Sequence, residues 1–354
     1  MRKSEQTLVL LSPAFPANET ETSWVPFIQL LVKELRSQFP QINIILFSFN
    51  HPENEVEYSW NDIQVIPFNG MHKKKLQRIF FRRQIWRKLK EIKKNNHVIG
   101  LFSFWCGECA LIGSWFGKRN HLKHFSWICG QDARRSNRMV KWIRPKPGEL
   151  VAISDSVSNI FYESHKIKPV HFIPNSIDKK IFPEFSGERN IDIIGVGSLS
   201  ILKNYDQFVS IISTLKELFP NIRAVQCGGG EDEENIKKLV EDMNLQKNIL
   251  LLGETPHQRA IELMQRSKIL LHPSSYEGFS TVCLEALYAG VHVISYTKPM
   301  DHDIRNWYVV KNIEEMIAKA SELLQDPNLI HERVMVYSIE DSAKAVMNLF
   351  NQAE

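Results

Sequence analysis

The second half of the chain alternates short apolar runs with amphipathic segments, and this alternation limits the possible folds most. Runs rich in Val, Ile and Leu, such as IDIIGVG at 191–197 and KILLHPS at 268–274, predict strands. The segment YDQFVSIISTLKELF at 205–219 has the apolar spacing of a helix. The further predicted strands are 223–229, 248–253 and 291–296, and the further predicted helices are 233–243, 256–267 and 281–290. Such alternation is typical of a parallel sheet that helices cover on both faces.

The first half repeats this order less regularly. Strands are predicted at 7–12, 43–49, 98–104, 124–130 and 150–154, and helices at 24–39, 73–95, 107–117 and 155–166. Because 354 residues are too many for one ordinary core, we expect two doubly wound α/β domains in tandem. The stretch 171–190, which contains prolines and a glycine, is the expected connection. A cleft between two such domains is the expected ligand site, because the carboxyl ends of both sets of strands face it.

Charge and cysteine content restrict the partners and the compartment. Residues 1–175 carry 26 Lys and Arg against 14 Asp and Glu, whereas residues 176–354 carry 18 against 26. We therefore expect the first domain to face something anionic. Five cysteines, an odd number, argue against a disulfide framework, and the short apolar run near the N-terminus makes a poor signal peptide. No apolar run reaches the ~20 residues of a membrane span. The cysteine usage fits a reducing cytoplasm best, so we expect a cytoplasmic protein.

The densest chemical signal is HPSSYEGFSTVCLEALYAGVHVIS at residues 272–295. A strand ends there at Pro273, and a short loop containing a glycine opens a helix near Ser280. Free backbone N–H groups at such a helix start form an anion site. Glu277 and Glu285 flank it, eight residues apart, which is ~12 Å along a helix axis. Because the carboxylates of a glycosidase lie roughly 5–9.5 Å apart, hydrolysis is not the natural interpretation. Recognition of one long, hydroxyl-rich, phosphate-bearing ligand fits better.

At this point the sequence resembles a known family. Residues 277–279 (EGF), 284–286 (LEA), Gly290 and 293–294 (VI) look like the signature of the family 4 retaining glycosyltransferases, which have the two-domain GT-B fold. Further matching segments follow in the expected order: VGSLS at 196–200 with Lys203 and Asn204, IPNSID at 173–178, CGGGE at 227–231, Leu252 with Gly253, 127–132, and YSIE at 337–340. The resemblance covers nearly the whole chain. It is strong over 191–296 and loose before residue 97.

The resemblance implies an architecture. It predicts two Rossmann-like domains that face a cleft, with the C-terminal helix returning to the first domain. The implied bounds are 1–172 for an acceptor-side domain, 173–190 for the connection, 191–335 for a nucleotide-sugar-binding domain and 336–354 for the returning helix.

The resemblance also implies the reaction and its site. A hexose-type sugar would pass from a nucleoside-diphosphate sugar to a glycan or lipid-linked acceptor, in cell-surface polysaccharide or lipopolysaccharide biosynthesis, without a metal or cofactor. Glu277 would hold the hexose, Lys203 would neutralise the diphosphate, and Glu285 would bind the ribose. The other implied donor-binding residues are Gly278, Phe279, Ser280, Thr281, Gly197, Ser198, Gly230, Glu231 and Leu252. The implied acceptor-side or cleft residues are Asp132, Cys129, Trp105, Gly107 and Asn175.

Several residues depart from the family pattern. Ser198 stands where the family has Arg, Asn204 where it has Gly, and Cys129 where it has His. The first strand–helix loop, 12–23, lacks the glycines that relatives often carry. These departures leave open a second hypothesis, a nucleotide-sugar-binding GT-B protein with weak or no transfer activity. Several residues also have plain structural alternatives: Asn175 as a turn residue, Asp132 as a partner of Arg134 or Arg135, and His272 as packing at a strand end.

Residues 73–94 carry eleven Lys and Arg and one Glu. Phe81, Ile85, Leu89 and Ile92 recur at helical spacing, which predicts an amphipathic helix whose apolar stripe packs inward. The basic face is either a solvated surface or a site for an anionic membrane surface or an acidic acceptor. A peripheral position on the inner face of the plasma membrane is therefore an expectation. Nucleic acid is not an expected partner.

The stretch FSFWCGECAL at 102–111 allows a third hypothesis, a thiol redox protein. Cys106 and Cys109 have the spacing of a thioredoxin motif at a helix start, where the pKa of the first thiol would fall. Its place inside a domain whose partner carries a sugar-transfer signature favours another interpretation. We expect Trp105 and Gly107 to line the acceptor side and Cys109 to be a small packing residue.

Overall fold

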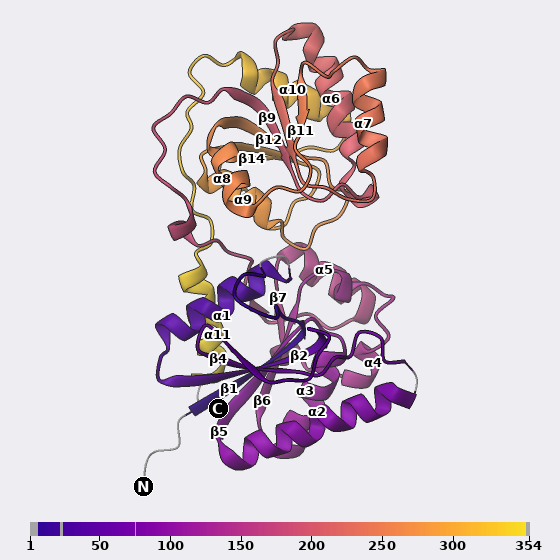
Figure 1. Cartoon of the computed structure of the whole chain (residues 1–354), viewed down its shortest axis with the longest axis vertical. Coiled ribbons are helices and arrows are strands. Elements are labelled where there is room, and N and C mark those ends of the chain that lie inside the picture. Colours follow the sequence, from indigo (N-terminus) through magenta and orange to yellow (C-terminus); the bar gives the residue numbers. More distant parts are fainter. Residues whose placement is uncertain (1–5, 22–23, 75, 352–354) are drawn as a thin grey trace. The chain divides into compact units, whose positions relative to one another are not determined.

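The computed structural model describes residues 6–21, 24–74 and 76–351, and it divides into two compact units. Unit 1 comprises residues 1–175 and 339–354, and unit 2 comprises residues 176–338 (Figure 1). Each unit is an α/β structure built on its own sheet, as the alternation of apolar runs predicts.

Unit 1 is built on eight strands in the order β3-β4-β2-β1-β5-β6-β7-β8, and only β3 runs antiparallel to its neighbour. The strands are β1 (Gln6–Ala14), β2 (Ile42–His51), β3 (Tyr58–Trp60), β4 (Ile63–Pro67), β5 (His97–Phe104), β6 (Lys123–Ile128), β7 (Leu150–Ala152) and β8 (His171–Phe172). The helices are α1 (Pro26–Gln38), α2 (Leu76–Asn95), α3 (Glu108–Asn120), α4 (Val140–Ile143), α5 (Asp155–His165) and α11 (Ile339–Asn351), with short 3-10 turns η1 (Gln131–Ala133) and η2 (Pro147–Glu149). The hairpin partners β3 and β4, the short strand β8 and helix α4 are absent from the sequence prediction.

Helix α2 buries the four apolar residues that the spacing singles out. Phe81, Ile85, Leu89 and Ile92 are its buried side chains, and they join a core with Val9 and Leu11 of β1 and with α3. Cys109 belongs to the same core, which confirms that it is a packing residue. The amphipathic pattern therefore predicted correctly which face of α2 packs inward.

The C-terminal helix α11 packs against α1 of unit 1, as the resemblance implied. Phe350 near its end contacts Phe125 of β6 edge to face, with ring centroids 5.2 Å apart. The ring also lies over Gly100 of β5, where an added Cβ would come within 2.4 Å of it. The glycine thus makes room for the helix on this face of the sheet.

Unit 2 is a wholly parallel sheet in the order β11-β10-β9-β12-β13-β14. Its strands are β9 (Ile191–Val196), β10 (Ala224–Cys227), β11 (Ile249–Leu251), β12 (Ser267–His272), β13 (His292–Ser295) and β14 (Trp307–Val309). Its helices are α6 (Tyr205–Leu218), α7 (Glu233–Asp242), α8 (His257–Gln265), α9 (Thr281–Tyr288) and α10 (Ile313–Gln325), with 3-10 turns η3 (Lys179–Ile181) and η4 (Ile201–Lys203).

Both faces of this sheet are covered. Ile193 and Ile269 join a core with α6, α7 and α10. The alternate strand residues Ile194 and Leu270 are also buried, and they point to the opposite face because side chains alternate along a strand. Helices α8 and α9 contact the strands as well. The loops after the strands therefore gather at the carboxyl edge of a doubly wound sheet, where ligands bind in such folds.

Candidate active site

Backbone hydrogen bonds join the loops that follow β9, β10 and β11. Leu199 N donates to Gly229 O at 2.9 Å, and Gly228 N donates to Gly253 O at 2.7 Å. Gly228 has φ +124°, and a Cβ there would lie 2.1 Å from Gly197 O. A Cβ at Gly230 would lie 2.2 Å from Leu199 O. The glycines thus allow the loops to approach each other in a way that no larger residue permits.

Turn η4, in the loop after β9, is fixed to the loop after β12. Asn204, which ends this turn and stands where the resembling family has glycine, has φ +52°, a left-handed conformation. Asn tolerates this conformation better than other side chains do. Its Nδ2 also donates to Pro273 O at 2.9 Å, and Ser275 N donates to Leu202 O at 3.1 Å. The departure at Asn204 is therefore accommodated, and it ties the two loops together.

Lys203 and Glu277 meet across these two loops. Lys203 Nζ donates to Glu277 Oε1, and His272 Nε2 lies 3.0 Å from the same oxygen. Burial alone would raise the pKa of Glu277, but the hydrogen bond from His272 and the charge of Lys203 lower it to about 2. Glu277 is therefore a carboxylate at neutral pH. Within the residues that the structure describes, its second oxygen, Oε2, accepts no hydrogen bond.

Helix α9 begins directly after this loop. Ser280 caps it, because its side chain accepts from Cys283 N at 3.4 Å. Glu285 is buried one turn further along, and its Oε1 lies 2.7 Å from His257 Nε2 at the start of α8. The hydrogen bond to Glu285 raises the pKa of His257 above 6.5, more than burial lowers it. The start of α9 thus lies between two carboxylates, and a histidine contacts each of them.

The other predicted donor-binding residues lie in the same loops. Ser198, Gly230, Glu231 and Leu252 are exposed, Gly197, Gly278 and Thr281 are partly exposed, and Phe279 is buried. The Phe279 ring packs against Trp307 and Tyr337, with centroid distances of 6.0 and 5.7 Å. Any contact from Phe279 to a ligand therefore comes from its backbone.

In unit 1, Asp132 organises two loops. Its Oδ2 accepts from Cys106 N at 2.7 Å, and its Oδ1 accepts from Cys129 N at 3.0 Å and Gly130 N at 2.9 Å. Burial raises the pKa of Asp132 to about 6, although these backbone hydrogen bonds act in the opposite direction. The carboxyl thus joins the loop after β5 to the loop after β6, and its hydrogen bonds are to backbone amides.

The redox hypothesis for the CGEC stretch is not supported by the environment of its thiols. Cys106 is fully buried, and burial together with the nearby Asp132 raises its pKa to about 12. Burial also raises the pKa of Cys109 and Cys129 well above the ordinary value. The expected fall in the pKa of Cys106 was wrong, because the thiol lies in the core just before the helix begins. A reactive thiol needs the opposite shift.

The remaining residues that were predicted on the acceptor side lie in three different parts of unit 1. Trp105 adopts φ +64°, and its ring contacts Phe27 with centroids 5.5 Å apart. Gly107 precedes α3, and a Cβ there would meet nothing within 4 Å. Asn175 is buried at the last residue of this part of unit 1. The resemblance grouped these residues as acceptor-side, and their contact with an acceptor stays a prediction.

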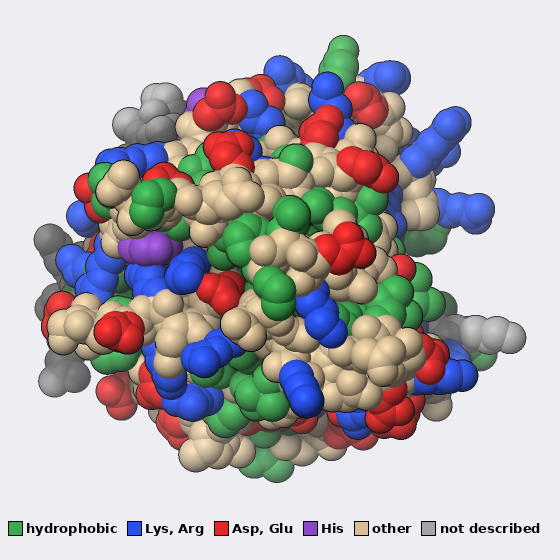
Figure 2. All heavy atoms as spheres, turned by 90° about the horizontal axis from the view of Figure 1, so that it is seen from above, with side chains coloured by type: hydrophobic (Ala, Val, Ile, Leu, Met, Phe, Trp, Pro, Cys, Tyr) green, Lys and Arg blue, Asp and Glu red, His purple; other side chains and the backbone are tan. Residues whose placement is uncertain are grey.

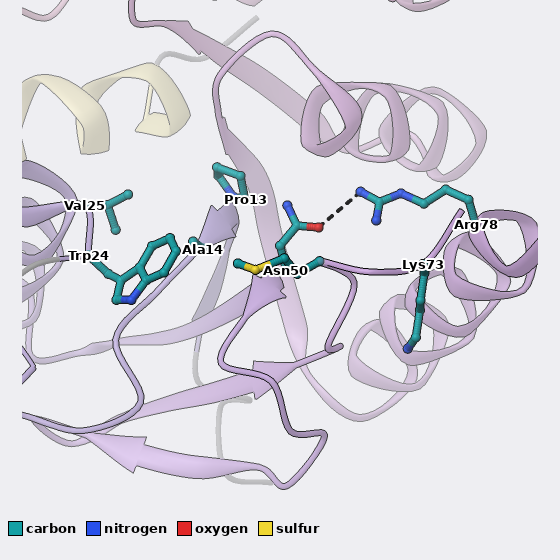
Figure 3. Close-up of a pocket in the computed structure, with 8 residues that line it drawn as sticks. Pro13, Ala14, Trp24, Val25, Asn50, Lys73 and Arg78 are labelled. Atoms are coloured by element: carbon teal, nitrogen blue, oxygen red, sulfur yellow. Dashed lines mark hydrogen bonds between the residues drawn. The ribbon is translucent and has the colours of Figure 1, made fainter. Parts of the chain in front are cut away.

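A cavity of about 510 Å³ in unit 1 was not foreseen. It lies where β1 and β2 end, and in Figure 3 Trp24 and Val25 lie on one side of Asn50 and Lys73 and Arg78 on the other. Its lining residues are Pro13, Ala14, Trp24, Val25, Asn50, Met71, Lys73 and Arg78. Arg78 is held by Asn50 Oδ1 at 3.1 Å and by Glu108, so this cation is fixed in place.

Two site residues were missed in the sequence. His272 was interpreted as packing at a strand end, and His257 was not singled out at all. Their contacts with Glu277 and Glu285 depend on how separate elements come together, so a single sequence gives no signal for them. Among the described residues, no group of three or more His, Cys, Asp or Glu side chains could hold a metal ion.

Comparison with known families finds a match for unit 2. The model of the family described as glycosyl transferases group 1 matches residues 176–338, the same residues that form this unit. Unit 2 as a whole is therefore similar to a glycosyl transferases group 1 domain. The match covers Lys203, Glu277 and Glu285 together.

Curated relatives carry the same activity class in their names. The gpi3 subunit of a phosphatidylinositol N-acetylglucosaminyltransferase from Schizosaccharomyces pombe is 25% identical over 214 residues, which are 58% of this chain and 47% of the relative. A poly(glycerol-phosphate) alpha-glucosyltransferase from Bacillus subtilis is 26% identical over 223 residues, 60% of this chain and 33% of the relative. The chain thus spans about half or less of the length of these relatives.

Solved structures of similar fold align with nearly the whole chain. A glycosyltransferase from Rickettsia africae aligns with a TM-score of 0.70 at 16% identity, covering 98% of this chain and 94% of that one. An Anabaena protein in complex with UDP aligns with a TM-score of 0.68 at 12% identity, covering 96% and 94%. The structural neighbours are GT-B glycosyltransferases, and the two Rossmann-like units of this chain have that fold.

Proposed function

We propose that this protein is a family 4 retaining glycosyltransferase that moves a hexose-type sugar from a nucleoside-diphosphate sugar to a glycan or lipid-linked acceptor. The observation that carries the proposal is the Lys203–Glu277 pair beside the start of α9, within the unit that the group 1 model matches. Lys203 and the positive end of the α9 helix dipole provide positive charge for the diphosphate. Glu277 Oε2 and Glu285 provide acceptors for hydroxyl groups of the sugar and the ribose.

The charges fit the demands of glycosyl transfer. As the bond to the sugar breaks, negative charge grows on the leaving phosphate and positive charge on the anomeric carbon. The charge of Lys203 and the dipole of helix α9 stabilise the phosphate, and the ionised Glu277 lies on the sugar side. This chemistry needs no metal ion, and Ser198 supplies no positive charge where the family has Arg.

The test is the release of nucleoside diphosphate from a panel of UDP-, GDP- and ADP-sugars. We expect Lys203→Ala and Glu277→Ala to lower kcat/KM by roughly 10²–10³, the effect of losing one charge-stabilising group. Lys268→Ala is the matched control, because this lysine pairs with Asp192 at 2.8 Å at the other end of β12 and should leave the rate unchanged. Tight donor binding without turnover on any acceptor would favour the inactive binding protein instead.

We further propose that the cavity of unit 1 receives the acceptor. Trp24 offers an aromatic surface for a sugar ring, and Lys73 and Arg78, each paired with a glutamate, place positive charge at the cavity for an acidic group. Trp24→Ala should raise the KM for the acceptor while the KM for the donor stays unchanged. An equal rise in the KM for the acceptor and the KM for the donor would contradict acceptor binding in this cavity.

The basic side of unit 1 supports a proposal for the membrane. Residues 76–146 carry 17 Lys and Arg against three Asp and Glu. Helices α2, α3 and α4 lie in contact, and on their outside Trp115 is 50% exposed and Trp142 60% exposed. Trp115 Nε1 donates to Trp142 O at 3.2 Å. By contrast, the face in Figure 2 mixes both signs of charge.

We propose that this α2–α3–α4 surface docks on an anionic membrane, such as the inner face of the plasma membrane. Basic residues with exposed tryptophans are typical of membrane interfaces. None of the described helices is long and apolar enough to cross a membrane. Sedimentation with vesicles tests the proposal: we expect binding to vesicles containing phosphatidylglycerol, little binding to pure phosphatidylcholine, and a loss with Trp142→Ala. Equal binding to both vesicle types would contradict it.

A further inference from the structure

His272 lies at the end of β12 with its side chain 3% exposed, and its Nε2 is 3.0 Å from Glu277 Oε1. A carboxylate only accepts hydrogen bonds, so this nitrogen carries the proton and donates. Lys203 donates to the same oxygen. Two donors thus share one oxygen of Glu277 and leave Oε2 for a ligand.

The two donors differ in what they can do once a donor substrate is bound. Lys203 is the cation proposed to meet the diphosphate, whose negative charges compete with Glu277 for it. Those charges also repel Glu277, and a like charge nearby raises the pKa of a carboxylate. His272 has no such competition, because it is buried behind Glu277 at the strand end. Its hydrogen bond is the one that persists when Lys203 turns to the phosphates.

We propose that His272 is a positioning residue that keeps Glu277 ionised and oriented toward the sugar while Lys203 binds the diphosphate. This inference rests on the proposed function. An ionised Glu277 accepts hydrogen bonds from sugar hydroxyls at Oε2, whereas a protonated one would lose part of that capacity. His272 thereby determines whether the sugar is recognised near neutral pH.

Other titrating groups around Glu277 do not obscure the effect. Lys203 faces it from η4, Cys283 from α9 and Tyr205 from α6. Burial raises the pKa of Cys283 to about 12 and the pKa of Tyr205 still further. His257 pairs with Glu285 and is present in every variant, so its contribution cancels in the comparison.

The experiment measures donor binding by calorimetry at pH 6, 7 and 8, in buffers of different ionisation enthalpy. The probe is whichever of UDP-glucose, GDP-mannose and ADP-glucose the wild-type protein binds most tightly. In His272→Leu we expect Glu277 to take up a proton on binding, so that the affinity falls as the pH rises, by up to tenfold per unit. The wild-type protein should lack this uptake by Glu277, so the slope of the variant should exceed that of wild type, to which His257 contributes equally in both.

Two variants separate positioning from general damage. His272→Gln keeps an N–H donor at the same reach and should restore the affinity to within about threefold of wild type. His292→Leu removes a buried histidine of the neighbouring strand β13, whose Nε2 lies 3.0 Å from Ile330 O, and should add no pH slope. If His272→Leu does not fold, His272→Asn, which is too short to reach Glu277, gives the same test.

The outcomes distinguish the two proposals. A wild-type protein that binds none of the three nucleotide sugars overturns the proposed function. A wild-type protein that binds, with a His272→Leu variant that shows the same affinity and no proton uptake, overturns the role of His272 alone.

Discussion

Asp132 in unit 1 and Glu277 in unit 2 lie in comparable places, since each follows a strand whose two neighbours are parallel to it. Asp132 uses both oxygens on three backbone N–H groups, and burial raises its pKa to about 6. Glu277 uses one oxygen on two side-chain donors, and these lower its pKa to about 2. The Asp132 carboxyl therefore holds two loops together, whereas the Glu277 carboxyl is ionised and has one oxygen available to a ligand. Position in the fold alone does not separate a structural carboxyl from a binding one.

The largest effect should come from Asp132→Ala. Two buried N–H groups and one partly buried N–H group would lose their acceptor, at roughly 1–3 kcal/mol each, partly offset by removal of a buried carboxyl. We expect a loss of about 4 kcal/mol in the unfolding free energy of unit 1. Tryptophan fluorescence during urea unfolding measures it, because seven of the eight tryptophans lie in unit 1. A loss under about 1 kcal/mol would show that Asp132 does not hold these loops.

The contribution of Glu277 to the free energy of unfolding should depend on pH. Its folded pKa of about 2 lies below its ordinary 4.5, so its stabilisation is present above pH 4.5 and is lost as the pH falls toward 2. A shift of this size corresponds to about 3 kcal/mol. The gap in unfolding free energy between wild type and Glu277→Gln should therefore shrink by about 2 kcal/mol between pH 7 and pH 3. Urea unfolding followed by circular dichroism measures the gap, and a gap that does not change with pH would contradict the ion pair.

Substitution of a glycine in each unit tests whether the loops after the strands of unit 2 need their close approach. Gly228→Ala puts a Cβ 2.1 Å from Gly197 O, so the strand-end loops of unit 2 must separate. We expect a loss of about 2 kcal/mol in stability and weaker donor binding. Gly107→Ala in unit 1 is the matched control, because its Cβ meets nothing within 4 Å, and its cost should stay under about 1 kcal/mol, the loss of a glycine N-cap. Equal effects of the two substitutions would mean that the close approach in unit 2 is not required.

The spacing of apolar residues predicted those parts of the fold that follow from helical or strand periodicity alone. The spacing of Phe81, Ile85, Leu89 and Ile92 fixed the buried face of α2, since helical periodicity alone sets it. Strands β3 and β4 were missed, because they are short and β3 lies in a polar stretch, so their pairing is set by contacts that a sequence window does not contain.

The candidate site also contains residues that the sequence predicted and residues that it did not. That Lys203 and Glu277 belong to one site came from the resemblance, because 74 residues separate them. The contacts of His272 and the burial of Cys106 depend on the packing around them. Periodicity and motif spacing therefore did not reveal either of them.

The smallest expected effect concerns Asn204, where the chain departs from the family glycine. Asn204→Gly relieves the left-handed conformation, worth about 1 kcal/mol, but loses the hydrogen bond to Pro273 O, worth about the same. We expect a change within about 0.5 kcal/mol and unchanged donor binding. Asn204→Ala keeps the unfavourable φ and also loses the bond, so it should cost about 1–2 kcal/mol. Chemical denaturation of the two variants measures the difference. If both variants weaken donor binding strongly, the amide of Asn204 takes part in binding, and the departure from glycine is functional rather than conformational.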